Sequence, residues 1–266
     1  MHNLSYSLGS IKRTVEESSK SNTFSSVKLL RGSGFENHYM ADDNESVLDL
    51  AIKAVEPIRE KLNKLDSIIW ATCLPENATI GSRQQFEKSK DVKPLMDYPA
   101  SRLQTYLSAS EAIVLGLGQQ ACTSMLGSIR VACGLLATEN TFNNILCITS
   151  DRFPKGAKYE QAYNLISDGA ACCVVTKEQK EFRIIGSHHI TNGAAVQAND
   201  EETASVYFTY MNRIVKEILD KYSLTIDDVN WIVPQNINHN AWQILSRVLK
   251  IDLKKVFKCF TTNFYR

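Results

Sequence analysis

The chain has 266 residues, which is somewhat less than two domains at about 150 residues per domain. Hydrophobic residues make up 44% and charged residues 22%, values typical of a soluble globular protein. With 30 basic and 29 acidic residues, the net charge of +1 gives no argument for nucleic acid as a partner. No apolar run approaches the roughly 20 residues that span a bilayer, and the start lacks a signal-like pattern. We therefore expect a cytoplasmic protein that binds neither nucleic acid nor membrane.

The seven cysteines indicate neither a disulfide framework nor a zinc site. Their number is odd, no Cys-x-x-Cys pair occurs, and most stand inside apolar runs. The simplest interpretation of each is a small buried hydrophobe, and we expect one or two at most to be reactive. No bound metal is expected. The cysteines stand at positions 73, 122, 133, 147, 172, 173 and 259.

Apolar periodicity predicts alternating helices and strands in the first part of the chain. Residues 46–58 carry one apolar stripe at helical spacing, and 67–72 read as a short buried strand. Residues 74–99 are rich in Pro, Lys, Asp and Ser, which predicts a long exposed loop or lid. A short helix over 101–107 and a strand over 112–118 follow.

The same alternation continues from Cys122. Helical spacing of apolar residues runs to Thr138, and buried strands are predicted at 144–150 and 169–176. Residues 182–190 alternate loosely and are expected to form a hairpin with the strand before them, through 177–180. The later predicted elements are a helix over 204–222, a strand over 229–233, a helix over 241–249 and a strand beginning at 255. This order is typical of a layered α/β fold with a largely buried sheet.

Cys122 stands between a predicted strand and a long predicted helix. Unpaired N–H groups and the positive end of the helix dipole stabilise a thiolate there, which a nucleophilic cysteine needs. Gly127, one turn further, lets another backbone or a ligand approach the helix. A buried core cysteine remains the alternative interpretation.

Five segments resemble, in order, those of the β-ketoacyl-acyl-carrier-protein synthase III family, which belongs to the thiolase-like condensing enzymes. The central one is Gln120-Ala-Cys122-Thr-Ser-Met-Leu-Gly127, followed by Cys133-Gly134, which resembles the family's active-site cysteine segment. The others are residues 31–35, 145–152, 165–171 and 224–234. The resemblance implies a thiolase-like α/β/α/β/α fold of two related halves. The expected halves are 1–177, which carries the nucleophile, and 181–266.

The chain departs from the family where a catalytic histidine is expected. The family reads Pro-His-Gln-Ala-Asn there, whereas this chain has Pro234-Gln235 in place of Pro-His, and Asn238 matches the final asparagine. A glutamine amide donates a hydrogen bond but does not exchange a proton near neutral pH. His239 is a further candidate that could reach the site, although a capping or solvent-facing role is the simpler interpretation. His188 and His189 are expected on a strand, in structural roles.

The family's third site residue stands in a Gly-Asn-Thr or Gly-His-Thr motif that does not occur before Arg266. Asn263 is the one late asparagine and looks like a residue preceding that motif. We therefore expect the second half to be incomplete, truncated at the C-terminus.

The resemblance implies an acyltransferase or decarboxylating condensing enzyme of fatty acid or polyketide-type biosynthesis, acting through acyl-Cys122. Its substrates would be thioesters of coenzyme A or of phosphopantetheine on an acyl carrier protein, with no permanently bound cofactor. The family's homodimer is expected, with 112–118 pairing across the interface. Two alternatives stay open: a non-catalytic homologue that binds acyl chains or partners an active subunit, and a cysteine-dependent thioesterase.

Overall fold

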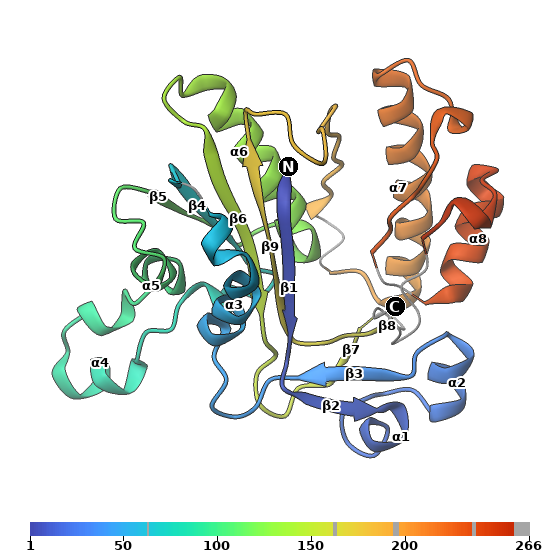
Figure 1. Ribbon diagram of the computed structural model, residues 1–266. Helices are drawn as coiled ribbons and strands as arrows, with labels where there is room; N and C mark the ends of the chain where they lie inside the picture. The colour runs from blue at the N-terminus through green and yellow to red at the C-terminus, as the bar shows by residue number, and fades with distance from the viewer. Residues whose placement is uncertain (63, 162–163, 194–196, 236–237, 258–266) are drawn as a thin grey trace. The chain divides into compact units, whose positions relative to one another are not determined.

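The computed structural model describes residues 1–62, 64–161, 164–193, 197–235 and 238–257, and the chain divides into two compact units (Figure 1). Unit 1 comprises Met1–Lys12, Tyr39–Ala157 and Ser167–Ile184. Unit 2 comprises Arg13–His38, Lys158–Ile166 and Ile185–Arg266. The units interleave along the sequence, and the consecutive halves expected from the resemblance stay a prediction.

Unit 1 is built on a five-stranded mixed sheet with the order β1-β9-β6-β4-β5. β4 lies between β5 and β6 and is parallel to both, whereas β9 is antiparallel to its neighbours β6 and β1. The strands are β1 (His2–Leu8), β4 (Ser67–Ala71), β5 (Ile113–Leu117), β6 (Asn144–Asp151) and β9 (Gly169–Thr176). The predicted strands β4, β5, β6 and β9 are thereby confirmed.

Helices cover both faces of this sheet, as Figure 1 shows for α3 (Val47–Val55) and α6 (Ser124–Thr138). On β4, Ile68 and Trp70 join the core cluster beneath α3, while Ile69 joins the cluster beneath α6. Successive strand side chains point to opposite faces, so a sheet covered on both sides needs the continuous apolar runs seen in the sequence. The α3 face also contains α5 (Pro99–Tyr106).

Unit 2 has its main apolar cluster between two helices, α7 (Asp200–Lys221) and α8 (His239–Leu249). Trp242 and Leu245 of α8 are buried there, with Phe208 and Met211 of α7 packed against them. Both predicted helices are therefore confirmed. The other helices and strands of unit 2 are α1 (Val15–Ser18), α2 (Val27–Gly32), β7 (Glu160–Gln161) and β8 (Asn164–Leu165).

Two short strands, β2 (Ile11–Thr14) and β3 (Asn37–Met40), pair with each other. The chain passes from one unit to the other within each of them.

The expected hairpin over 182–190 is wrong. These residues form no strand, and β9 instead pairs with β6 and with β1. Phe182 and Ile185 are 52% and 74% exposed, so their alternation does not reflect a buried face. His188 and His189 consequently stand outside any strand.

The segment 74–99 is not the unstructured loop that its composition predicted. It contains α4 (Arg83–Ser89), which Ser82 caps by accepting the N–H of Gln85. Pro75 and Pro94 each stand in the first turn of a 3-10 helix, where a missing N–H costs nothing. Proline therefore starts turns here without interrupting α4.

The two strands predicted near the end reduce to one parallel bridge between Ile232 and Val256 within the described residues. This bridge lies in unit 2.

By length and composition alone, Ala121–Thr138 is the one described helix that could cross a membrane, with 22% of it buried. Ala132 and Leu136 on this helix pack in the core against β6. A helix that covers the sheet of a soluble protein meets the same criteria, so the observation is weak evidence for a membrane span.

Candidate active site

Three parallel strands of unit 1 bring Cys73, Cys122 and Asp151 to one edge of the sheet. Ala71 at the end of β4 is level with Leu117 of β5 and with Thr149 of β6. Cys73 follows β4 by two residues, Cys122 follows β5, and Asp151 ends β6. The carboxyl edge of parallel strands is where α/β proteins build their sites.

Cys122 lies in a single 3-10 turn, Ala121–Thr123, directly before α6. Its neighbour Ala121 has φ +44°, a left-handed conformation that is costly for a residue with a Cβ. The hydroxyl of Ser124 lies 2.8 Å from the carbonyl oxygen of Thr72 and 2.6 Å from that of Ala121. The strained turn is thus tied to the end of β4, and the predicted strand-to-helix position of Cys122 is confirmed.

The Cys122 thiol has a second thiol beside it. Its Sγ lies 3.6 Å from Sγ of Cys73, and Cys122 is exposed while Cys73 is half-buried. A hydrogen bond from the Cys73 thiol lowers the pKa of Cys122 to about 6, helped by the Cys122 backbone N–H and opposed by burial and by Asp151. The same bond, with burial, raises the pKa of Cys73 well above its usual range. The directions of these two shifts favour Cys122 over Cys73 as the thiolate of the pair.

Asp151 holds the segment that carries Cys73. Its two carboxylate oxygens share the backbone N–H of Cys73, at 2.9 Å for Oδ2 and 3.0 Å for Oδ1. Oδ1 also accepts the backbone N–H of Leu74 at 3.1 Å. The Thr72 hydroxyl and the Asn77 amide donate to the same carboxylate, at 2.5 and 2.8 Å. These donors, together with the Thr149 hydroxyl at 3.5 Å, hold the segment that carries Cys73 against one carboxylate.

Gly127 makes room for a side chain of its own segment. A Cβ at this position would lie 1.7 Å from Oε1 of Gln120. The close approach was expected of another backbone or a ligand, and it is made instead by this side-chain amide, within unit 1.

The remaining predicted site residues lie in unit 2. Gln235 is exposed, outside any helix or strand. Burial raises the pKa of the neighbouring Tyr207 phenol to about 12, a shift that Gln235 opposes. Asn238 is the N-cap of α8, because its Oδ1 accepts the N–H of Ala241 at 2.8 Å, and its own N–H donates to Asn164.

His239 begins α8, and its Nε2 lies 2.8 Å from Nε2 of Gln243. The cap that was considered for His239 is provided by Asn238. His188 pairs with Glu217 at 2.5 Å, in keeping with a structural role. Asn263 lies outside the described residues. No group of three or more His, Cys, Asp or Glu side chains in the part of the chain that the structure describes is placed to hold a metal.

Asp168, whose segment entered the resemblance, is a buried structural carboxylate. It accepts the N–H of Ala41 at 2.7 Å and that of Phe153 at 2.8 Å. These bonds join three segments of unit 1 before β9 begins.

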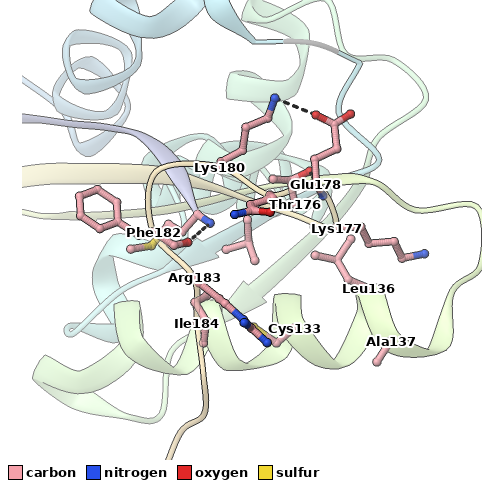
Figure 2. A pocket seen from close by; sticks show the side chains of 13 residues that line it. Cys133, Leu136, Ala137, Thr176, Lys177, Glu178, Lys180, Phe182, Arg183 and Ile184 are labelled. Carbon is pink, nitrogen blue, oxygen red and sulfur yellow. Dashed lines mark hydrogen bonds and ion pairs between the residues drawn. The ribbon is translucent and has the colours of Figure 1, made fainter. Parts of the chain in front are cut away.

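A hollow of about 460 Å³ elsewhere on unit 1 does not include Cys122 (Figure 2). Its charged groups serve the surrounding chain: Lys180 pairs with Glu178, and Lys177 donates to the carbonyl oxygens of Glu139 and Asn140. The hollow is open on one side and carries no arrangement that resembles a reactive centre. The chemistry-bearing side chains of unit 1 gather at Cys122 instead.

Known proteins match both the sequence and the fold of this chain. The family described as 3-oxoacyl-[acyl-carrier-protein] synthase III matches residues 118–193, which include Cys122. "Beta-ketoacyl-[acyl-carrier-protein] synthase III 2" of Staphylococcus epidermidis is 25% identical over 248 residues, or 82% of this chain and 70% of that protein. The chain is a synthase III-like protein of the thiolase fold. The family resemblance and the fold class expected from the sequence are therefore confirmed.

Solved structures support the same fold for this synthase III-like chain. The 3-oxoacyl-[acyl-carrier-protein] synthase III of Aquifex aeolicus gives a TM-score of 0.78 at 19% identity, covering 96% of this chain and 82% of that one. The priming β-ketosynthase of the R1128 polyketide biosynthetic pathway gives 0.71 at 14% identity, covering 95% and 78%.

Sequence reasoning missed Cys73. A signal was present, because the residue follows the buried run Ser67–Ala71 by two positions. What the sequence did not give was the pairing of β4 with β5 that brings residues 49 apart into contact.

Proposed function

We propose that this synthase III-like chain is an acyltransferase or decarboxylating condensing enzyme that acts on acyl thioesters through an acyl-Cys122 intermediate. The observation that carries the proposal is the exposed Cys122 directly before α6, with the Cys73 thiol 3.6 Å from its Sγ. The names of the related proteins support acyl carrier protein as the carrier and polyketide-type biosynthesis as one setting. Thioesters of coenzyme A and fatty acid biosynthesis are carried over from the family resemblance. No permanently bound cofactor enters the proposed reaction.

In the acylation step, the Cys122 thiolate attacks the carbonyl carbon of the thioester. Its S–C bond forms, the S–C bond of the substrate breaks, and the released thiolate takes a proton from water. Backbone N–H groups at the start of α6, that of Cys122 among them, would stabilise the oxyanion. Because the hydrogen bond from Cys73 lowers the pKa of Cys122 to about 6, a thiolate is available near neutral pH without a general base.

The second half reaction is where this chain departs from its relatives. Gln235 can donate a hydrogen bond to a malonyl carbonyl but cannot exchange a proton near neutral pH. Asn238 and His239 stay predicted site residues of this step. The glutamine favours one alternative, a homologue that takes up acyl groups or partners an active subunit without condensing.

Intact-protein mass spectrometry with acyl thioesters tests the proposal. We expect an acyl adduct on the wild-type protein and none on Cys122→Ala, with Cys133→Ala as the matched control that keeps it. Absence of any adduct, stable or transient, in the wild type would overturn acyl transfer. An adduct that moves to neither malonyl nor alcohol acceptors supports the non-condensing homologue, and rapid release of free acid supports a thioesterase.

Substituting Gln235→His tests the missing base separately. We expect faster decarboxylation of a malonyl thioester in a protein that still acylates at Cys122. An unchanged rate would count against Gln235 as the counterpart of the family's histidine.

We also propose that the protein is a homodimer in which β5 pairs with β5 of a second copy. β5 is an edge strand of the unit 1 sheet, and its Ile113 is 52% exposed. Light scattering should show that Ile113→Lys weakens the dimer, whereas Val92→Lys, at an equally exposed position, does not. A monomeric wild-type protein would rule the dimer out.

A further inference from the structure

The structure places a second sulfur where it can react with the proposed nucleophile. Cys73 and Cys122 are 49 residues apart in sequence, yet their Sγ atoms are separated by 3.6 Å. A disulfide needs about 2.05 Å between sulfurs, so the two side chains must close the gap by about 1.5 Å in total.

We propose that Cys73 and Cys122 are a site of oxidative modification, at which hydrogen peroxide converts the two thiols into a reversible disulfide. The formation of the bond does not depend on the proposed function. Its consequence for activity rests on the proposed function, since a disulfide would remove the nucleophile of acyl transfer.

The chemistry balances with one peroxide for each pair of thiols. The Cys122 thiolate attacks one peroxide oxygen, the O–O bond breaks, and hydroxide leaves and is protonated to water. The sulfenic acid formed on Cys122 is then attacked by the Cys73 sulfur. The S–S bond forms, the S–O bond breaks, and the departing hydroxide takes the Cys73 proton as a second water. Two thiols lose two electrons in all, and the peroxide gains them.

Each cysteine is suited to one step of this sequence. Cys122 is the exposed member, and its lowered pKa supplies the thiolate that reacts with peroxide. Cys73 is half-buried and reaches a sulfenic acid on Cys122 because Asp151 accepts its backbone N–H. Exposed, low-pKa cysteines with a resolving thiol beside them are the usual redox-sensitive sites.

A disulfide would also protect the nucleophile. Without a resolving thiol, sulfenic acid proceeds to sulfinic acid, which thiol reductants do not restore. Closing the bond stops oxidation at a stage that a dithiol reverses.

Peptide mapping after peroxide treatment tests the proposal on the full chain. Trypsin leaves Cys73 alone on the peptide 65–83 and Cys122 alone on the peptide 103–130, because no Lys or Arg interrupts either. We expect these two peptides to be linked after oxidation and alkylation without reductant, and to separate on adding dithiothreitol. The intact mass should fall by two hydrogens, without a covalent dimer.

Two variants make the result decisive. Cys73→Ser should give no linked peptide, and its Cys122 should label with a sulfenic-acid reagent and then oxidise beyond recovery. Cys133→Ser, which alters a half-buried thiol of α6, should retain the linked peptides. A wild-type Cys122 that is oxidised while remaining unlinked to Cys73 would overturn the proposal.

Activity is measured separately, so the two proposals can fail independently. If the reduced protein acylates, we expect acylation to fall in proportion to the linked fraction and to return with dithiothreitol. A protein that forms the disulfide but is never acylated would support the modification site and contradict the proposed acyl transfer. A protein that acylates equally well when fully linked would overturn the switching role.

Discussion

Unit 1 contains two pairs of cysteines whose thiols lie side by side, one pair beyond the ends of the strands and the other within the buried sheet. Cys73 and Cys122 stand beyond the carboxyl ends of β4 and β5, with Cys122 exposed. Cys147 and Cys173 face each other directly across the antiparallel strands β6 and β9 and are both buried beneath α6. In each pair, a hydrogen bond between the thiols lowers the pKa of one member and raises that of the other.

Because a buried thiol is out of reach of reagents, we expect a lowered pKa to make a cysteine reactive only where the thiol is also exposed. Cys173 has its pKa lowered by Cys147, yet the sheet and α6 keep reagents away from it. Cys122 combines the same kind of partner with exposure and a position before a helix. We therefore expect reactivity to depend on where the strands end.

The largest contrast should appear in alkylation of the native protein. We expect iodoacetamide to modify Cys122 at least about a thousandfold faster than Cys147 or Cys173, because the buried pair reacts only after opening of a core that is stable by several kcal/mol. Quenched time points with peptide mapping give each rate. Comparable alkylation rates at the two pairs would show that burial does not protect Cys147 and Cys173.

Removing Cys73 should change the pH dependence of Cys122. In the wild type, alkylation should rise through pH 6 and level off above it, since the thiolate already predominates at pH 7. In Cys73→Ala the lost hydrogen bond should move the midpoint upward by about two pH units, toward the free value of ~8.5. Cys172→Ala, which alters a buried thiol outside both pairs, should leave the midpoint near 6.

Asp151 and Asp66 lie at opposite ends of the parallel strands. Substituting each in turn distinguishes an effect on stability from an effect on the position of Cys73. Asp151 accepts the N–H groups of Cys73 and Leu74, and Asp66 accepts those of Asn143 and Asn144. Either substitution by Asn should lower the free energy of unfolding by about 2 kcal/mol, as expected for hydrogen bonds to a charged group. Urea unfolding measures this loss.

Asp151→Asn alone should also reduce the yield of the disulfide between Cys73 and Cys122 on oxidation. Asp66→Asn is the matched control, because it loosens the strands at their far end. Equal yields in the two variants would show that Asp151 does not position Cys73.

The smallest effect should come from the strained residue before Cys122. Ala121 has φ +44°, where a Cβ costs about 1–2 kcal/mol, so Ala121→Gly should stabilise the protein by up to about 1 kcal/mol. Ala137→Gly, at an exposed position of α6, should destabilise it by up to about 1 kcal/mol. Thermal unfolding distinguishes the two signs, and destabilisation by Ala121→Gly would contradict the strain.

Much of the unit 1 sheet could be predicted because its strands are buried on both faces. β4, β6 and β9 are continuous apolar runs, as strands between two helical layers must be. β1 could not be predicted in this way, because its Leu4 and Tyr6 are more than half exposed while Ser7 faces α3 and donates to Leu50. In β1 polar side chains face the core and apolar ones face solvent, which is the reverse of the alternation used to predict a half-buried strand.

The site was predicted in part for a similar reason. Cys122 could be found from local order, since strand, turn and helix follow one another along the chain. Cys73 and Asp151 join it only through the register of β4 with its neighbours, which local periodicity does not contain. Gln235 was visible as a departure from a motif, and its catalytic effect stays a prediction.

The site around Cys122 is assembled from segments that follow different strands. The nucleophile follows β5, whereas the thiol that sets its ionisation and, by our proposal, its response to oxidants follows β4. A single substitution at position 73 would therefore change both the ionisation of Cys122 and its response to oxidants, while the segment and helix that carry Cys122 keep their sequence. Evolution, or an engineer, could retune the redox behaviour of this protein without rebuilding the segment that performs its chemistry.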